Sequence, residues 1–232
     1  MNFKIRSYEK ELLDAENIPL VDLYQNLNEL AFINTYLGGF NISVAGVSQL
    51  IKDINRSYHI VDIGCGGGDN MLAVLLWAAK NNVRITLTGI DMKKDAIEYA
   101  RKNCALFPNI QFIESDYKLA TFTEPVDIII SSLFCHHLDD EQLEECLNWM
   151  DKIARVGFVI NDLERNKIAY YSIKWLSGLF SKSYLVKNDA AVSVSRGFKK
   201  MEIEKYMLKA GIRDYTVAWK WAFRYLVVAA KK

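Results

Sequence analysis

The chain lacks any apolar stretch as long as the roughly 18 uninterrupted residues that a membrane span needs. Its first residues, MNFKIRSYEKELLD, also lack the apolar centre of a secretory signal peptide, so we expect no export. The four cysteines, Cys65, Cys104, Cys135 and Cys146, form no C-x-x-C pair and no metal-ligand spacing. The sequence therefore predicts a cytoplasmic protein with reduced cysteines, and it predicts no metal site.

The chain has almost no net charge, because 29 Lys and Arg residues face 28 Asp and Glu residues. This balance hides an asymmetry: residues 1–150 carry 12 basic and 21 acidic side chains, whereas residues 151–232 carry 17 basic and 7 acidic ones. The basic part could face an anionic partner such as a carrier-protein arm, a lipid surface or RNA. Alternatively, the two oppositely charged surfaces merely keep the fold in solution. The length of 232 residues suits one domain with a substantial core.

From residue 58 onward, β-branched runs alternate with helical periodicity, which indicates βαβ units around a parallel sheet. We expect parallel strands over 59–63, 85–90, 109–113, 126–131 and 156–160. Helices are expected over 70–81, 93–105, 140–154 and 198–210, the third of them capped by Asp139. Two last strands, 213–219 and 222–230, should form a hairpin. Residues 1–50 look helical.

The segment HIVDIGCGGGDN, residues 59–70, is the most informative part of the sequence. It predicts a strand that enters a helix through Gly64, Gly66, Gly67 and Gly68. Such a turn lets a ligand lie against the backbone, and the unpaired N–H groups of the helix can hold a carboxylate or phosphate. A dinucleotide fingerprint, G-x-G-x-x-G, would need its third glycine at position 69, which is an aspartate.

The pattern Asp62-x-Gly64-x-Gly66-x-Gly68 instead resembles the first motif of class I S-adenosylmethionine-dependent methyltransferases of the small-molecule type. Asp91 ends the next strand, where it could accept hydrogen bonds from both ribose hydroxyls. By the resemblance, Asp116, which follows the third strand, meets the adenine amino group. The resemblance covers roughly residues 55–230. The predicted cofactor-binding residues are Asp62, Gly64, Cys65, Gly66, Asp91, Met92, Asp116, Tyr117, Ser132 and Leu133.

The resemblance implies an α/β fold with a Rossmann-like class I methyltransferase sheet. Five parallel strands are joined by a C-terminal hairpin with an antiparallel strand, and helices cover both faces. We divide the chain into an N-terminal helical cap, residues 1–50, and a methyltransferase domain, residues 51–232, with a lid-like insertion at 163–197. In many small-molecule members, such N-terminal helices form one wall of the substrate pocket. The insertion contains AYYSIKWLSGLF, which either lines a pocket for a flat or apolar substrate or packs on the core as a helix.

The candidate catalytic residues are His136, His137 and Asp162. The two histidines follow the fourth strand, at the edge where open α/β sheets bind ligands. Their segment is similar to the S-x-x-x-H-H-L stretch of ubiquinone/menaquinone-type methyltransferases. By that resemblance, Ser132 and Leu133 touch the cofactor through their backbone and one histidine is the base that faces the acceptor. We favour His136, which is nearer the strand end, although the sequence does not choose between the two.

Each of these candidates has a simpler alternative. Both histidines could merely shape the start of the next helix. Asp162 is a second group for proton handling, and an ion pair with Arg165 is the competing interpretation. His59, which leads into the first strand, is expected to be structural.

The sequence thus predicts methyl transfer from S-adenosylmethionine, with S-adenosylhomocysteine as product, to a small aromatic or apolar metabolite. The hypothesis that we favour is O-methylation of a phenolic, polyketide or quinol-type hydroxyl, with a histidine as the base. C-methylation of a quinol ring, RNA methylation and non-catalytic cofactor binding are the alternatives. No N/D-P-P-Y motif follows the fourth strand and no cysteine stands where RNA cytosine C5 enzymes keep their nucleophiles, which argues against DNA and RNA. Peripheral membrane contact through AYYSIKWLSGLF stays open. The sequence does not fix the acceptor or the oligomeric state.

Overall fold

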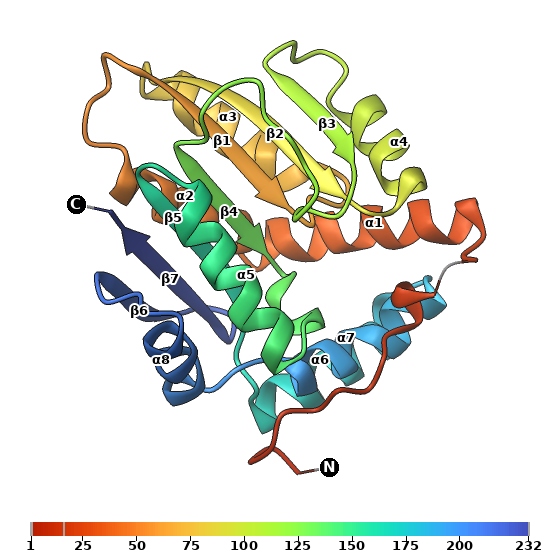
Figure 1. The fold of residues 1–232 in the computed structure, drawn as a ribbon. Coiled ribbons are helices and arrows are strands. Elements are labelled where there is room, and N and C mark those ends of the chain that lie inside the picture. Colours follow the sequence, from red (N-terminus) through yellow and green to blue (C-terminus); the bar gives the residue numbers. More distant parts are fainter. Residues whose placement is uncertain (1, 16, 232) are drawn as a thin grey trace.

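A computed structural model describes residues 2–15 and 17–231. Within these residues, seven strands form one sheet in the order β3-β2-β1-β4-β5-β7-β6 (Figure 1). Strands β1 to β5 are parallel, whereas β7 pairs antiparallel with both β5 and β6. This confirms the predicted sheet with its closing antiparallel hairpin. The strands are β1 (Ser57–Ile63), β2 (Arg84–Asp91), β3 (Ile110–Glu114), β4 (Ile128–Ser132), β5 (Gly157–Leu163), β6 (Tyr215–Lys220) and β7 (Arg224–Ala230).

The four helices that the periodicity predicts are α3, α4, α5 and α8, with ends that differ by a few residues, whereas α7 was not predicted. Asp139 caps α5 as expected: its carboxylate accepts a hydrogen bond from the Gln142 N–H, and the Gln142 side chain accepts one from the Asp139 N–H. The helices are α1 (Leu20–Tyr36), α2 (Gly39–Leu50), α3 (Asp69–Lys80), α4 (Lys94–Asn103), α5 (Asp140–Ile153), α6 (Lys167–Phe180), α7 (Tyr184–Arg196) and α8 (Lys200–Lys209). Two short 3-10 turns are η1 (Leu12–Asp14) and η2 (Cys135–His137).

Hydrophobic cores fill both faces of the sheet. On one face, α5 and α8 pack against β4, β5 and β7, with Leu147 and Met207 among the buried residues. On the other face, α2 and α3 cover the central strands, with Val47 and Met71 fully buried. The middle strands are therefore apolar on both sides, which explains the unbroken run Ile128, Ile129 and Ile130 in β4.

Strand β5 runs three residues beyond its predicted end, to Leu163. Its polar residues Asn161 and Asp162 pair with Leu226 and Tyr225 of β7, so their backbone groups are satisfied inside the sheet. Both side chains are buried. A purely apolar pattern ends before them, which is why the sequence placed them outside the strand.

Segments outside the sheet lie over its carboxyl edge, where Figure 1 shows α1 running across the ends of β1 and β2. In the insertion, α7 buries Leu185 and Val186, whereas α6 keeps much of its apolar surface exposed, with Trp175 and Phe180 at 66% and 72%. The division into a cap, a domain and a lid stays a prediction. Among the described residues, no single helix has both the length and the apolar composition of a membrane span; α1 and α2 reach them only jointly, across a bend of 68°.

Candidate active site

A cavity of about 880 Å³ opens at the carboxyl edge of the sheet. Its floor is the glycine turn after β1 together with the ends of β2, β3 and β4, and α1 contributes Leu23, Leu27 and Leu30 as a wall. All ten residues that the sequence predicts for cofactor binding line this one cavity. Because parallel strands end at the same edge, residues up to 71 positions apart in the chain come together here.

Asp62, at the end of β1, lines the cavity and has one buried carboxylate oxygen without a partner among the described residues. Its Oδ2 accepts a hydrogen bond from Asn70 Nδ2 at 3.2 Å, while its buried Oδ1 has no hydrogen-bond partner among the described residues. Burial raises the pKa of this carboxyl to about 7, against the smaller opposing effect of Asn70. A buried carboxylate oxygen without a donor suits a ligand that brings one, such as an ammonium group.

Asp91 and Gly66 form a second part of the cavity floor. The Asp91 carboxylate accepts hydrogen bonds from Gly66 N–H at 3.0 Å and from Lys93 N–H at 2.9 Å. Each carboxylate oxygen keeps acceptor capacity for a further donor, such as a ribose hydroxyl. Gly66 has φ +50°, and a Cβ there would meet only Leu27 Cδ2, at 3.7 Å. The space beside this glycine therefore belongs to the cavity and can admit a ligand, so the residues present fit the expected cofactor.

The remaining predicted cofactor residues close the other side of the cavity. Asp116 anchors its turn by accepting a hydrogen bond from Lys118 N–H, and the Tyr117 ring packs edge-on against Phe134. Leu133 adopts a positive φ of 55°, and its N–H donates to the Asn161 carbonyl at 3.0 Å. That N–H is already engaged, so a backbone contact from Leu133 to the cofactor would use its carbonyl group.

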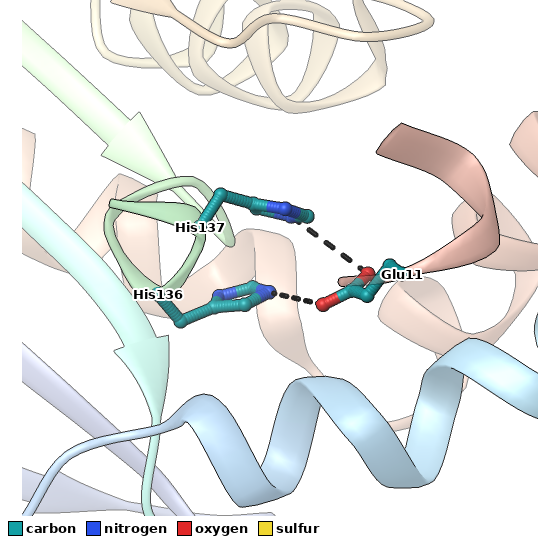
Figure 2. A group of neighbouring side chains, drawn as sticks. All are labelled: Glu11, His136 and His137. Atoms are coloured by element: carbon teal, nitrogen blue, oxygen red, sulfur yellow. Dashed lines mark ion pairs between the residues drawn. The ribbon is translucent and has the colours of Figure 1, made fainter. Parts of the chain in front are cut away.

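The two histidines lie in η2 with their ring centroids 4.3 Å apart and their planes tilted by 33°. His136 is buried, and its Nδ1 lies 2.7 Å from Asp162 Oδ1. His137 lines the cavity, and its Nδ1 lies 3.0 Å from Asp14 Oδ1. Both Nε2 atoms point at the carboxylate of Glu11, at 3.5 Å from His136 and 3.9 Å from His137 (Figure 2). His136 is not among the residues that line the cavity.

Buried charges surround this pair. Burial alone would lower the pKa of His136, but Asp162 and Glu11 on either side raise it to about 9. Burial would raise the pKa of Asp14, yet the hydrogen bond to His137 and the Arg196 guanidinium lower it to about 2. The carboxylates are therefore ionised at neutral pH, and His136 holds a proton between two of them.

Residues 2–15, here called the N-terminal strap, bring Glu11 and Asp14 to the histidines. Arg6 of the strap is buried and donates hydrogen bonds to the carbonyls of His136 and Leu138. Arg196 of α7 donates to the carbonyls of both histidines and pairs with Asp14 at 3.2 Å. The sequence analysis missed Glu11 and Asp14, because nothing in their local spacing connects two acids in a charged segment with a motif 125 residues away.

The insertion at 163–197 supports the strap. Asp189 of α7 is buried, and its two carboxylate oxygens accept hydrogen bonds from Leu12 N–H and Leu13 N–H, both at 2.8 Å. No residue of the insertion is among those that line the described cavity. The segment AYYSIKWLSGLF itself forms helix α6, in which only Ala169 and Ser177 are buried, so it is helical but its aromatic residues do not pack into the core. An active lid stays a prediction.

The suggested ion pair between Asp162 and Arg165 is wrong. Asp162 binds both the ring and the backbone N–H of His136. Arg165 lies after the end of β5, and its backbone N–H donates a hydrogen bond to the Phe198 carbonyl. Its guanidinium pairs with Glu202 at 2.6 Å. The expected structural role of His59 agrees with its position: it is buried, with Nε2 at 2.8 Å from Thr88 Oγ1.

Comparisons with known proteins agree with this architecture. The sequence profile of a family described as "Methyltransferase domain" matches residues 54–207. A malonyl-[acyl-carrier protein] O-methyltransferase of Halalkalibacterium halodurans is 30% identical over 105 residues, which are 43% of this chain and 36% of that protein. The chain spans less than half the length of the two curated relatives that it matches.

Two solved structures share the fold over nearly the whole chain. A SAM-dependent methyltransferase from Aquifex aeolicus superposes with a TM-score of 0.65 at 14% identity, covering 89% of this chain and 97% of that one. The plantazolicin methyltransferase BpumL, in complex with SAH, gives a TM-score of 0.64 at 18% identity and covers 91% and 96%. At such low identities, the two comparisons show only that the fold is shared.

Proposed function

Because the chain belongs to the methyltransferase-domain family, we propose that it transfers the methyl group of S-adenosylmethionine to a small acceptor molecule. The proposal rests on one observation: the same cavity is lined by Asp62, Gly66 and Asp91 at its floor and also by His137. Two ligands bound in this cavity would lie side by side. S-adenosylhomocysteine is then the product.

The floor residues have distinct roles in this proposal. Asp62 Oδ1 receives the ammonium group of the cofactor, and the Asp91 carboxylate receives the ribose hydroxyls. Asp116 meets the adenine amino group. Gly64, Cys65, Met92, Tyr117, Ser132 and Leu133 line the walls against which the cofactor packs. When bound, the cofactor supplies an electrophilic methyl group, so the protein has to align the acceptor with it and keep water out.

We infer an oxygen acceptor on an aromatic or apolar molecule. The wall above the floor is apolar, with Leu27, Leu30 and Phe40 among its residues. A phenol or quinol hydroxyl must lose its proton during transfer, which calls for a nearby base. His137 is the histidine that reaches the cavity, so we assign it the contact with the acceptor. The sequence favoured His136, but its burial suits a supporting role between Asp162 and Glu11.

Isotope-labelled S-adenosylmethionine and a panel of phenols and quinols test the proposal. We expect calorimetry to give micromolar binding of the cofactor and none of NADH, and His137→Gln to lower kcat by about 10²–10⁴-fold with cofactor affinity unchanged. His59→Gln, the same change at a buried histidine outside the cavity, is the control. Cofactor binding without transfer to any acceptor would favour a non-catalytic protein, and unchanged turnover in His137→Gln would remove the histidine from the mechanism.

The same assay separates the alternatives. Nuclear magnetic resonance of the product distinguishes O-methylation from C-methylation of a quinol ring, which would use the same cavity. RNA methylation would require tight binding of RNA that weakens steeply with salt. A product methylated at carbon or on RNA would replace the oxygen acceptor proposed here.

A further inference from the structure

Three side chains that commonly bind metal ions meet between the N-terminal strap and η2. Glu11, His136 and His137 face one another, and one ligand atom from each lies within 4.8 Å of the other two (Figure 2). The side chains of Glu11 and His136 are each only 3% exposed, whereas that of His137 is 24% exposed. The cluster is therefore buried at Glu11 and His136 and reaches the cavity at His137.

The orientation of both rings is fixed from behind by carboxylates. Asp162 lies 2.7 Å from Nδ1 of His136, and Asp14 lies 3.0 Å from Nδ1 of His137. Once His136 gives up one proton, a hydrogen on each Nδ1 leaves the lone pair of each Nε2 directed at Glu11. Histidines that bind metal ions show this arrangement, with one nitrogen on the metal and the other donating to a carboxylate.

The distances around Glu11 suit a shared cation better than hydrogen bonds. Its oxygens lie 3.5 Å from Nε2 of His136 and 3.9 Å from Nε2 of His137, and Oε1 has no hydrogen-bond partner among the described residues. Normal N–H···O hydrogen bonds measure about 2.7–3.2 Å. Ligands 2.0–2.1 Å from a tetrahedral zinc ion are separated by about 3.3 Å. Without a cation, the proton on His136 supplies the positive charge that the buried Glu11 carboxylate needs, and a bound cation would take the place of that proton.

We propose that Glu11, His136 and His137 bind one divalent cation, for which two imidazoles and one carboxylate are a suitable ligand set and zinc the first probe. The fourth position faces the cavity beside His137. The carboxylates of Glu11, Asp14 and Asp162 surround the two rings, and the cations beside them are Arg196, which pairs with Asp14, and Arg6, which donates to the His136 carbonyl.

The inference deepens the proposed function, on which the role of the cation rests. A hydroxyl bound at the open position would lose its proton to water more readily: the O–H bond breaks, the oxygen keeps the electron pair, and the cation holds the resulting alkoxide or phenoxide. The lone pair of His137 serves either as the base or as a ligand. The cation-loaded and cation-free proteins would therefore activate the acceptor differently.

Cation binding itself needs neither cofactor nor acceptor, so it can be tested separately from methyl transfer. The full chain is stripped with a chelator, and ZnCl2 is then titrated by calorimetry, with metal content measured by mass spectrometry after desalting. We expect one zinc per chain and at least 100-fold weaker binding in Glu11→Gln and His136→Ala. His59→Gln should bind as the unchanged protein does. Cobalt should give the intense visible bands of a four-coordinate site.

His137→Ala is the second variant, because its partly exposed side chain can be removed with little risk to folding. It should also lose zinc at least 100-fold while keeping its circular dichroism spectrum and S-adenosylmethionine affinity. Zinc binding that is absent, or that survives in His137→Ala, would overturn the site and leave a proton on His136 as the charge beside Glu11. Zinc binding without methyl transfer would uphold the site and refute only the proposed function.

Discussion

Replacing Asp62 by asparagine should make the cofactor-free protein more stable and its cofactor site weaker. The buried carboxyl has a pKa of about 7, against a usual value of 3.8. At about 1.36 kcal/mol per pKa unit, ionising it inside the fold costs about 4 kcal/mol at pH 8. Asparagine keeps the oxygen that accepts from Asn70 but carries no charge. It also turns an amide N–H toward the cavity, so we expect a net gain of about 2–4 kcal/mol.

The sign of the pH dependence follows from the folded protein's raised pKa. Between the unfolded and folded pKa values the native state binds more protons than the unfolded state, so the native protein loses stability as pH rises from about 4 to about 7. Asp62→Asn removes this dependence. The stability gained by the substitution should be full at pH 8, about two fifths as large at pH 5, and nearly gone at pH 4.

Urea unfolding and melting temperatures at several pH values provide the measurement. For a chain of this size the gain corresponds to a rise in Tm of about 5–10 °C at pH 8. Asp53→Asn is the control, because Asp53 is exposed and its hydrogen bond from Asn55 N–H can be accepted equally by asparagine. A variant no more stable than the parent at pH 8, or one whose advantage persists at pH 4, would refute the reasoning.

The same substitution should weaken S-adenosylmethionine binding by about 10–150-fold, the loss of a hydrogen bond to a charged group. In the parent protein, the affinity should rise with pH up to about 7, since the ammonium group binds the ionised carboxylate. The affinity of the variant should not change over this range. Equal affinities for parent and variant, measured by calorimetry at pH 8, would mean that Asp62 does not hold the ammonium group.

Three further substitutions test other parts of the structure. Asp91→Ala should weaken cofactor binding by about 1–3 kcal/mol in calorimetry, and undiminished affinity would mean that the ribose lies elsewhere. Gly66→Val should abolish binding while leaving the circular dichroism spectrum intact, because the added side chain would enter the cavity; retained binding would show that the turn is not the cofactor cradle. Arg165→Ala should destabilise the fold by about 3 kcal/mol in urea unfolding, because it leaves the Gly197 carbonyl and Glu202 without their buried partner. A loss below about 1 kcal/mol would contradict that role.

Local sequence patterns were sufficient to predict which residues lie at the carboxyl edge of the sheet. Asp62 and Asp91 each end a β-branched run, and parallel strands bring such ends together whatever the connecting helices do. The antiparallel hairpin followed from two short apolar segments behind Gly211. These features depend on periodicities of two and 3.6 residues, which a single chain displays directly.

The carboxylate surroundings of the histidines could not be predicted in this way. Glu11 and Asp14 reach η2 through tertiary packing, held by Arg6 and Arg196, and no local pattern encodes such a contact. In the sequence, Arg165 is a nearby cation for Asp162. In the structure the two side chains have different partners, because β5 ends between them: Asp162 contacts His136, and Arg165 contacts Glu202. Buried polar pairs of this kind are decided by where strands end and how the chain turns afterwards.

The N-terminal strap also has a consequence for how the protein is made. Arg6 donates to the Arg196 carbonyl, a contact between residues 190 positions apart. At a synthesis rate of 5–20 residues per second, the partners of the strap emerge about 10–40 s after it. Until then Glu11 and Asp14 stay in water, and the histidines lack their carboxylate partner. The residues that complete the surroundings of the two histidines are thus among the first to be synthesised, and they can bind only after α7 has been made.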